Sequence, residues 1–385
     1  MASMEVDSGN VSKFLAEQQA SAPEELRRYY HDFEDLYDRK LWHQLTTRVE
    51  EFVNIPSSGP YLVPLYQNFL TDWEDKINKL KLVQFGLAAA TQFEDVSSSV
   101  DFLTRLMEKV NAPESQDAYV QAKIETAHWQ LLMGKVEETK TAMDECDKLL
   151  DGFTTVETVI YASFYRVCAE YYKAKAEYAQ YYKNALLYLA CVNIDDLTVA
   201  EKEERAYDLS ISALLGDTIY NFGELLMHPI LDSLNNTEHE WLRSLLFAFN
   251  SGDIGKFEGL ASHFSKQSLL ESNMAALSRK ICLMSLIEAV FKRSADDRNI
   301  PFADIATETR LPVEEVEHLV MKALSLKLIK GSIDQVAQVV HVTWVQPRVL
   351  DKDQIDAMRQ RLQTWDESVR KMALFVQEEG GEVFA

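Results

Sequence analysis

The chain has 385 residues with a formal net charge of −22, and 47% of them are hydrophobic, enough for roughly two or three domains with sizeable cores. A field of this sign repels phosphate backbones and anionic lipid, which argues against nucleic acid and membrane surfaces as partners. The sequence holds only 13 glycines and 9 prolines. Their scarcity predicts long helices joined by short connections.

Nothing in the sequence indicates secretion or a membrane span. The N-terminal segment MASMEVDSGNVSKF has neither a basic start nor an apolar core. No apolar run reaches the roughly 18 residues of a membrane helix. The cysteines lie far apart and form no Cys-x-x-Cys pair: Cys146, Cys168, Cys191 and Cys282. We therefore expect reduced, buried thiols in a cytoplasmic and nuclear protein.

The N-terminal part of the chain is expected to be mainly helical. Residues 1–22 are polar and predict a disordered tail. After them, amphipathic helices follow one another with breaks of a few residues. Gly134 and Gly252 mark two helical hairpins in which the first helix must end in a left-handed conformation, and Glu170–Tyr182 resembles a third with alanines instead of glycine. Repetition of helix, turn and helix predicts a TPR-like solenoid of antiparallel helical pairs.

The pattern changes after about Met274. The predicted elements are then a helix at 275–291, a strand at 300–302, helices at 303–309 and 313–326, and two strands joined by a turn at 334–337. In the return strand, Val340, Val342 and Trp344 are expected to share one face. This order is that of a winged helix, with the hairpin as its wing. An unpaired wing edge suits strand addition by a neighbouring protein.

A single long helix is predicted at the C-terminal end. Its apolar residues alternate between spacings of three and four: Ile355, Met358, Leu362, Trp365, Val369, Met372 and Val376. A sustained period of 3.5 makes an apolar seam that packs along other helices, or alternatively against the chain's own domain. The predicted segments are a disordered tail at 1–22, helical repeats at 23–172, further helices at 173–271, a winged helix at 272–350, the C-terminal helix at 351–379 and a loose tail at 380–385.

No catalytic or cofactor-binding motif is found. His239-Glu240 lacks the second histidine of a zinc-protease helix, because Arg243 stands in its place. Neither a glycine-rich phosphate loop nor a nucleophile elbow occurs. We expect no enzyme activity, metal, cofactor or small-molecule substrate.

A nucleic-acid-binding adaptor is the alternative from another class. The tyrosines and lysines between Tyr171 and Lys183 could form a stacking platform, although tyrosines at helical spacing more often pack between helices. A winged helix also suggests DNA binding. The helix that would enter the major groove begins with Glu314, Glu315 and Glu317, however, and these carboxylates would be repelled by phosphate.

Three stretches carry a resemblance to a known family. They are Asp35–Leu45 (DLYDRKLWHQL), Asn221–Pro229 (NFGELLMHP), and the winged-helix segment from Val320 through KGSID to TWVQPRVL at Leu350. With the helical array, the acidic winged helix and the heptad helix, they make the chain similar to the PCI-domain subunits. Such subunits build the proteasome lid, the signalosome and a translation initiation factor.

The resemblance implies a non-catalytic scaffold of the proteasome regulatory-particle lid, which supports degradation of ubiquitinated proteins. It implies a hetero-oligomer with other PCI-domain lid subunits. Lateral contact would use Val340, Val342, Trp344 and the wing backbone, and the C-terminal seam would enter a helical bundle. The segment 173–271 would be the helical part of the PCI domain. A scaffold of the signalosome or of the initiation factor is the nearest alternative.

Overall fold

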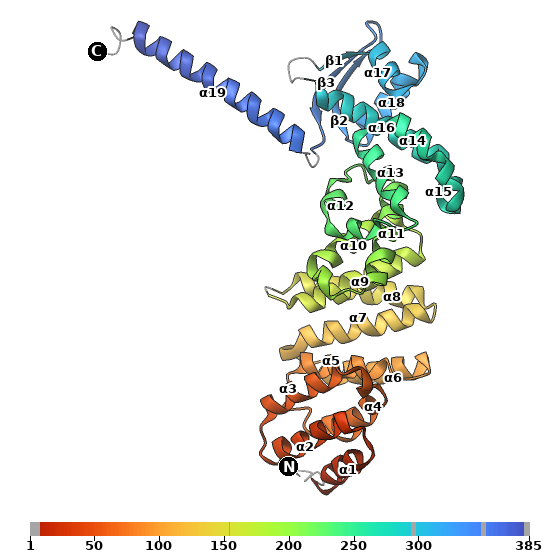
Figure 1. Cartoon of the computed structure of the whole chain (residues 1–385), viewed down its shortest axis with the longest axis vertical. Coiled ribbons are helices and arrows are strands. Elements are labelled where there is room, and N and C mark those ends of the chain that lie inside the picture. Colours follow the sequence, from red (N-terminus) through yellow and green to blue (C-terminus); the bar gives the residue numbers. More distant parts are fainter. Residues whose placement is uncertain (1–7, 154, 294–297, 348–351, 381–385) are drawn as a thin grey trace. The chain divides into compact units, whose positions relative to one another are not determined.

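The computed structural model describes residues 8–153, 155–293, 298–347 and 352–380 (Figure 1). The elements pack into two compact units, Met1–Asp196 and Leu197–Ala385. Both are mainly helical, and the described residues contain one small sheet of three strands, in the second unit. In the part of the chain that the structure describes, no helix is both long and apolar enough to cross a bilayer.

The first unit is a stack of helices. Alternate helices α3, α5, α7 and α9 contact one another as well as their neighbours in sequence, the contact pattern of a helical solenoid. The prediction of stacked helical pairs is therefore confirmed. The bounds are α1 Ser8–Ser21, α2 Glu24–Asp38, α3 Trp42–Val53, η1 Pro56–Ser58, α4 Gly59–Asn68, η2 Leu70–Asp72, α5 Lys79–Ala90, α6 Val96–Val110, η3 Pro113–Ser115, α7 Gln116–Leu132, α8 Val136–Asp151, α9 Thr158–Ala174, α10 Tyr178–Cys191 and η4 Ile194–Asp196.

In each predicted helical hairpin, the first helix is followed by a residue in the left-handed conformation. Gly134, Ala176 and Gly252 have φ angles of 80°, 57° and 64°. In each case the N–H of the following residue donates to a carbonyl of the last helical turn, for example Lys135 N to Gln130 O at 3.0 Å. This pairing satisfies carbonyls that the helix end leaves free. The alanine hairpin predicted from sequence is thus a genuine turn of the same type.

Helix α1 contradicts the predicted disordered tail. Residues 8–21 are helical, and Val11 and Leu15 are buried in the core of the first unit, where α1 packs against α2. Val11 and Leu15 are four residues apart and so lie on one helical face. This stripe is short and is surrounded by serine, alanine and glutamine, which concealed it in the sequence. Residues 1–7 lie outside the described residues.

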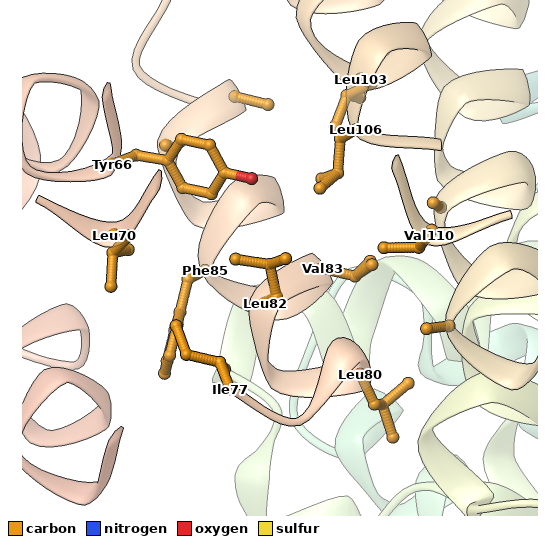
Figure 2. Close-up of a cluster of buried hydrophobic side chains, with 14 of the residues drawn as sticks. Tyr66, Leu70, Ile77, Leu80, Leu82, Val83, Phe85, Leu103, Leu106 and Val110 are labelled. Atoms are coloured by element: carbon orange, nitrogen blue, oxygen red, sulfur yellow. The ribbon is translucent and has the colours of Figure 1, made fainter. Parts of the chain in front are cut away.

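The core of the repeats is formed by apolar stripes from successive helices. Helix α6 buries Leu103, Leu106 and Val110, spaced by three and four residues. Figure 2 shows them facing side chains of α5, such as Leu82 and Val83, with the ring of Tyr66 alongside. Burying such side chains stabilises the fold by about 25 cal/mol for each Å² of apolar surface removed from water.

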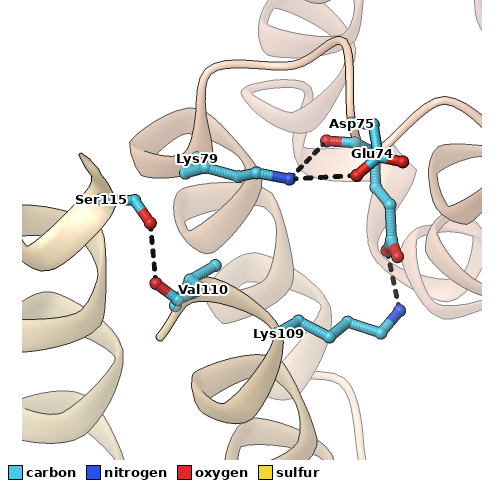
Figure 3. A network of polar contacts seen from close by, with 6 residues as sticks. All are labelled: Glu74, Asp75, Lys79, Lys109, Val110 and Ser115. Atoms are coloured by element: carbon cyan, nitrogen blue, oxygen red, sulfur yellow. Dashed lines mark hydrogen bonds and ion pairs between the residues drawn. The ribbon is translucent and has the colours of Figure 1, made fainter. Parts of the chain in front are cut away.

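Polar side chains fix the connections between these helices (Figure 3). Lys79 Nζ, at the start of α5, lies 3.1 Å from Glu74 O and 3.6 Å from a carboxylate oxygen of Asp75. Lys109 Nζ, near the end of α6, lies 2.7 Å from Glu74 Oε2. Ser115 Oγ donates to Val110 O at 2.8 Å and so caps the C-terminal end of α6. The loop before α5 is therefore tied to both helices.

A largely buried ion pair links α7 to α9. Arg166 Nη2 lies 2.7 Å from both carboxylate oxygens of Glu125, which is buried. Beside it, His128 Nδ1 lies 2.6 Å from Glu170 Oε2. A buried charge is tolerated when it is paired and hydrogen-bonded. The pair therefore fixes the register between alternate helices of the stack.

The second unit begins later than predicted. The expected boundary between 172 and 173 falls inside α9, whereas the contacts divide the chain between Asp196 and Leu197. The reason is that α9 and α10 form one hairpin through the left-handed Ala176. The bounds are α11 Val199–Leu215, α12 Gly223–Met227, η5 Pro229–Leu234, α13 Glu240–Ser251, α14 Ile254–Leu260, η6 Ala261–Lys266, α15 Ser268–Ser272, α16 Met274–Lys292, β1 Asn299–Pro301, α17 Phe302–Thr309, α18 Val313–Ser325, β2 Ile329–Asp334, β3 Val339–Val345 and α19 Lys352–Gly380.

The winged helix is present in the predicted order. Helix α16 packs against α17, α18 and β3, and the antiparallel sheet has the strand order β1–β3–β2. Ile300 pairs with Val340, and Ile333 pairs with Val340 from the other side. The return strand β3 is therefore the centre of the sheet, and β1 and β2 are its edges.

Candidate interaction surfaces

The side chains of Val340 and Val342 belong to the core and not to a contact surface. They are 1% and 5% exposed, on the face of β3 that packs against α16. Val342 N also donates to Arg298 O at 3.0 Å, which ties β3 to the segment leading into β1. The prediction that these two residues make lateral contacts is wrong, because β3 lies between two strands.

Trp344 does not share a face with the two valines. The pairing of β2 with β3 shifts between Lys330 and Gly331, so that Trp344 pairs with Lys330 and Val342 with Gly331. Thr343 is thus an extra residue in β3, and such a bulge reverses the alternation of side chains beyond it. Trp344 is 36% exposed, and Lys330 Nζ lies 4.8 Å from its ring centroid. The bulge makes Trp344 the one predicted lateral-contact side chain that is accessible.

The free edge of the wing is β2. Successive residues of a strand direct their N–H and C=O groups to opposite sides. The N–H of Val342 donates toward β1, so the backbone groups of the preceding residue, His341, are directed toward its partner Ser332 in β2. The residues on either side of Ser332, Gly331 and Ile333, therefore direct their backbone groups to the unpaired side of β2. Among the described residues, no strand pairs with that side. The opposite edge, β1, has only three residues, and its Pro301 lacks an N–H group.

Helix α19 exposes its whole predicted seam. The side chains Ile355, Met358, Leu362, Trp365, Val369, Met372 and Val376 are between 46% and 66% exposed. Leu374 and Phe375 are exposed as well, and sequence reasoning missed them because they lie outside the heptad pattern. The 29-residue helix therefore carries a long row of exposed apolar side chains. Gly380, predicted as part of a loose tail, is the last residue of α19, and 381–385 lie outside the described residues.

The helix that would read DNA is acidic at its exposed start. Glu314 and Glu315 lie in the first turn of α18 and are exposed. Glu317 accepts a hydrogen bond from Gln335 of the wing at 3.0 Å. In the tyrosine-rich segment, Tyr171 and Tyr182 are buried between helices, where a base cannot stack on them. The absence of a nucleic-acid partner therefore stays a prediction, which the exposed carboxylates of α18 and the burial of Tyr171 and Tyr182 favour.

The cysteines are packing residues or partly covered thiols. All four are free, Cys146 and Cys168 are buried, and Cys191 and Cys282 are half-buried, which is less than predicted. Burial raises the pKa of Cys146 to about 12, so this thiol is protonated at neutral pH. Within the described ranges, no three His, Cys, Asp or Glu side chains gather as a metal-ligand set.

A helical array that leads into an α-β-α-α-β-β winged helix defines a class of proteins. The PCI domain profile matches residues 256–344, so the chain is a PCI-domain protein. Profiles for the PSD13 N-terminal repeats and the Rpn9 C-terminal helix match residues 29–246 and 348–380. The chain belongs to the family of the 26S proteasome non-ATPase regulatory subunit 13, also called Rpn9.

Relatives match over nearly the full length of the chain. A probable 26S proteasome regulatory subunit rpn9 of Schizosaccharomyces pombe is 43% identical and covers 97% of this chain and 98% of the relative. The 26S proteasome non-ATPase regulatory subunit 13 homolog B of Arabidopsis thaliana is 42% identical, covering 96% and 98%. The regulatory subunit RPN9 of Saccharomyces cerevisiae is 37% identical, covering 97% and 98%. The family resemblance predicted from the three sequence stretches is therefore confirmed.

Proposed function

We propose that the protein is a non-catalytic scaffold subunit of the 26S proteasome regulatory-particle lid. It assembles with other PCI-domain lid subunits and so supports ATP-dependent degradation of ubiquitinated proteins. The relatives are named as regulatory subunits of this complex, and the candidate surfaces of this chain are suited to protein contacts. We further propose that it works in the cytoplasm and the nucleus.

The exposed seam of α19 is the observation that carries this proposal. Its seven apolar side chains follow a period of 3.5 residues, and each is at least 46% exposed. Burying a side chain of this size contributes about 2 kcal/mol. Helices of other subunits would cover the seam in a bundle, since neighbouring helices in a bundle interlock at this spacing.

The edge of β2 would provide the second contact. Gly331 and Ile333 direct backbone groups outward, and an extended segment of a neighbouring subunit can bond to them as an added strand. Trp344 and Lys330 lie on the exposed face of the same hairpin and would flank the junction. Of the predicted lateral contacts, this proposal keeps the wing backbone and Trp344 and drops the side chains of Val340 and Val342, which are buried.

The seam is tested by the double substitution Leu362→Asp and Val369→Asp in a chain co-expressed with the other lid subunits. Two carboxylates in a bundle core would each cost several kcal/mol, so we expect loss of the chain from the assembled lid. Gln363→Asp with Gln377→Asp adds the same charge to exposed positions outside the seam and should assemble normally. Normal occupancy of the Leu362/Val369 variant, measured by native mass spectrometry, would disprove the bundle role.

A further inference from the structure

A pocket of about 580 Å³ lies in the second unit between the end of α11, the first half of α16 and the end of α18. Its floor is apolar, formed by Leu214, Leu277 and Leu283 with Leu326 beside them. Arg279 and Lys322 line it from two different helices and are exposed. The volume is in the range of sites that hold a small ligand or a few side chains.

The two cations have no carboxylate partner in the part of the chain that the structure describes. Among the described residues, neither Arg279 nor Lys322 makes an ion pair, and Arg279 donates its Nε to Ala275 O at 3.2 Å. One carboxylate, that of Asp217, also lines the pocket and is exposed. On a chain with a net charge of −22, two unpaired cations around one apolar pocket favour an anionic occupant.

Lys280 contributes to the wall of the pocket but offers no free donor. It is buried, and its Nζ donates to Ala213 O, Leu214 O and Gly216 O at 2.8, 3.0 and 2.8 Å. It thereby caps the end of α11, where helix carbonyls lack partners. Burial lowers the pKa of Lys280 to about 7, and Asp217 opposes this shift. Because the Nζ of Lys280 is buried against these carbonyls, the accessible positive charge lies in the exposed Arg279 and Lys322.

We propose that this pocket docks an acidic segment of a neighbouring protein chain, with one apolar or aromatic side chain seated on the leucine floor. The carboxylates flanking that anchor would pair with Arg279 and Lys322. A small inorganic anion would leave the apolar floor of Leu214, Leu277 and Leu283 uncovered, whereas a side chain anchored between carboxylates would cover it. The pocket shares no residue with the α19 seam or the β2 edge, so it goes beyond the scaffold contacts proposed above.

The probe is a fluorescein-labelled peptide in which a tryptophan is flanked on both sides by glutamates, titrated with the full chain. We expect saturable binding that weakens as salt rises. Arg279→Glu with Lys322→Glu should weaken binding by at least about tenfold, since two attractions become repulsions. Lys183→Glu with Lys327→Glu makes the same change in charge at exposed lysines outside the pocket and should bind as the unaltered chain does.

A second variant separates the pocket from a general surface attraction. Ala276 lines the pocket and is exposed, so Ala276→Trp should fill it without disturbing the core and should abolish binding. Leu362→Asp with Val369→Asp in α19 should leave binding unchanged, so failure here is distinct from failure of the bundle role. Absence of saturable binding, equal binding of a lysine-flanked peptide, unchanged binding by Ala276→Trp, or competition by inorganic phosphate alone would each overturn the proposal.

Discussion

Two glycines with the same backbone conformation are expected to differ in how they tolerate alanine. Gly134 and Gly252 both have left-handed φ angles, but a Cβ at Gly134 meets nothing within 4 Å, whereas one at Gly252 would lie 2.6 Å from Ser285 Cα. Gly134→Ala should therefore cost about 1 kcal/mol, from the backbone conformation alone. Gly252→Ala should cost about 3 kcal/mol, because α13 must also move away from α16.

Hydrogen exchange measured by mass spectrometry gives the local stability of each hairpin separately. The α7–α8 hairpin should open slightly more often in Gly134→Ala, and the α13–α16 region should open far more often in Gly252→Ala. Equal protection losses in the two variants would show that close packing against α16 contributes nothing at Gly252.

His228 is expected to make the second unit less stable in weak acid. Its Nδ1 accepts a hydrogen bond from Ile230 N at 3.3 Å and so caps η5 in the neutral form. Burial lowers the pKa of His228 below its ordinary value of 6.5. The unfolded chain therefore binds a proton near pH 6.5 while the folded chain does not. The contribution of His228 to the free energy of unfolding is fully present above about pH 6.5, and it is lost as the pH falls toward the lower pKa of His228 in the folded chain.

Asparagine at 228 keeps a capping acceptor but cannot titrate. The difference in the free energy of unfolding between the natural chain and His228→Asn should shift in favour of the variant as the pH falls from about 7.5 to about 5. Urea unfolding followed at several pH values measures this difference. A difference that stays constant across the range would rule out His228 as the cause.

Some residue-scale features were predictable and others depend on three-dimensional contacts. The left-handed turns at Gly134 and Gly252 follow from glycine after an amphipathic run. Trp344 was misplaced because a bulge at Thr343 leaves no mark on an alternating pattern. Lys280 was not singled out at all, since its acceptors are carbonyls more than 60 residues away in sequence, such as Ala213 O.

At the scale of elements, the free edge of β2 yields a proline test. Ile333 directs its N–H away from β3, whereas Ser332 directs its own toward His341. Ile333→Pro should remove a donor from the outer edge at a cost of about 1 kcal/mol or less to the fold, because proline is tolerated on edge strands. Incorporation into the lid, measured by native mass spectrometry, should nevertheless fall.

Two matched variants serve as controls for Ile333→Pro. Ile333→Ala loses side-chain packing but keeps the N–H, so it should assemble like the natural chain. Ser332→Pro breaks a bond inside the hairpin and should destabilise the winged helix by about 3 kcal/mol, measured by thermal unfolding. Full incorporation of Ile333→Pro would refute strand addition at this edge.

The positions of most strands and helices could be predicted from the sequence. The strands, the acidic helix α18 and the seam of α19 follow from periods of 2, 3.6 and 3.5 residues. The position of β3 in the middle of the sheet could not be predicted from the sequence, because the strand order depends on where β1 pairs. As a result, Val340 and Val342 were assigned to an interface although α16 covers them. Helix α1 was missed because its stripe has few apolar residues.

At the scale of the whole molecule, the two units have different contact chemistry. The first is a helical stack whose large apolar side chains are mostly buried. The second carries the unpaired edge of β2, the exposed apolar side chains of α19 and the pocket lined by Arg279 and Lys322. We infer that assembly depends mainly on the second unit. Composition alone predicted a helical protein with large cores, but it could not predict the complex to which the chain belongs, because net charge and helix content do not distinguish one PCI-domain complex from another.

The most direct test of the scaffold role is mass spectrometry of the proteins that co-purify with the intact, affinity-tagged chain from cells. We predict that the 26S proteasome regulatory subunits will be recovered together, with the other PCI-domain lid subunits near equal amounts. Recovery of signalosome or translation initiation factor subunits instead, or of the chain alone, would contradict the account.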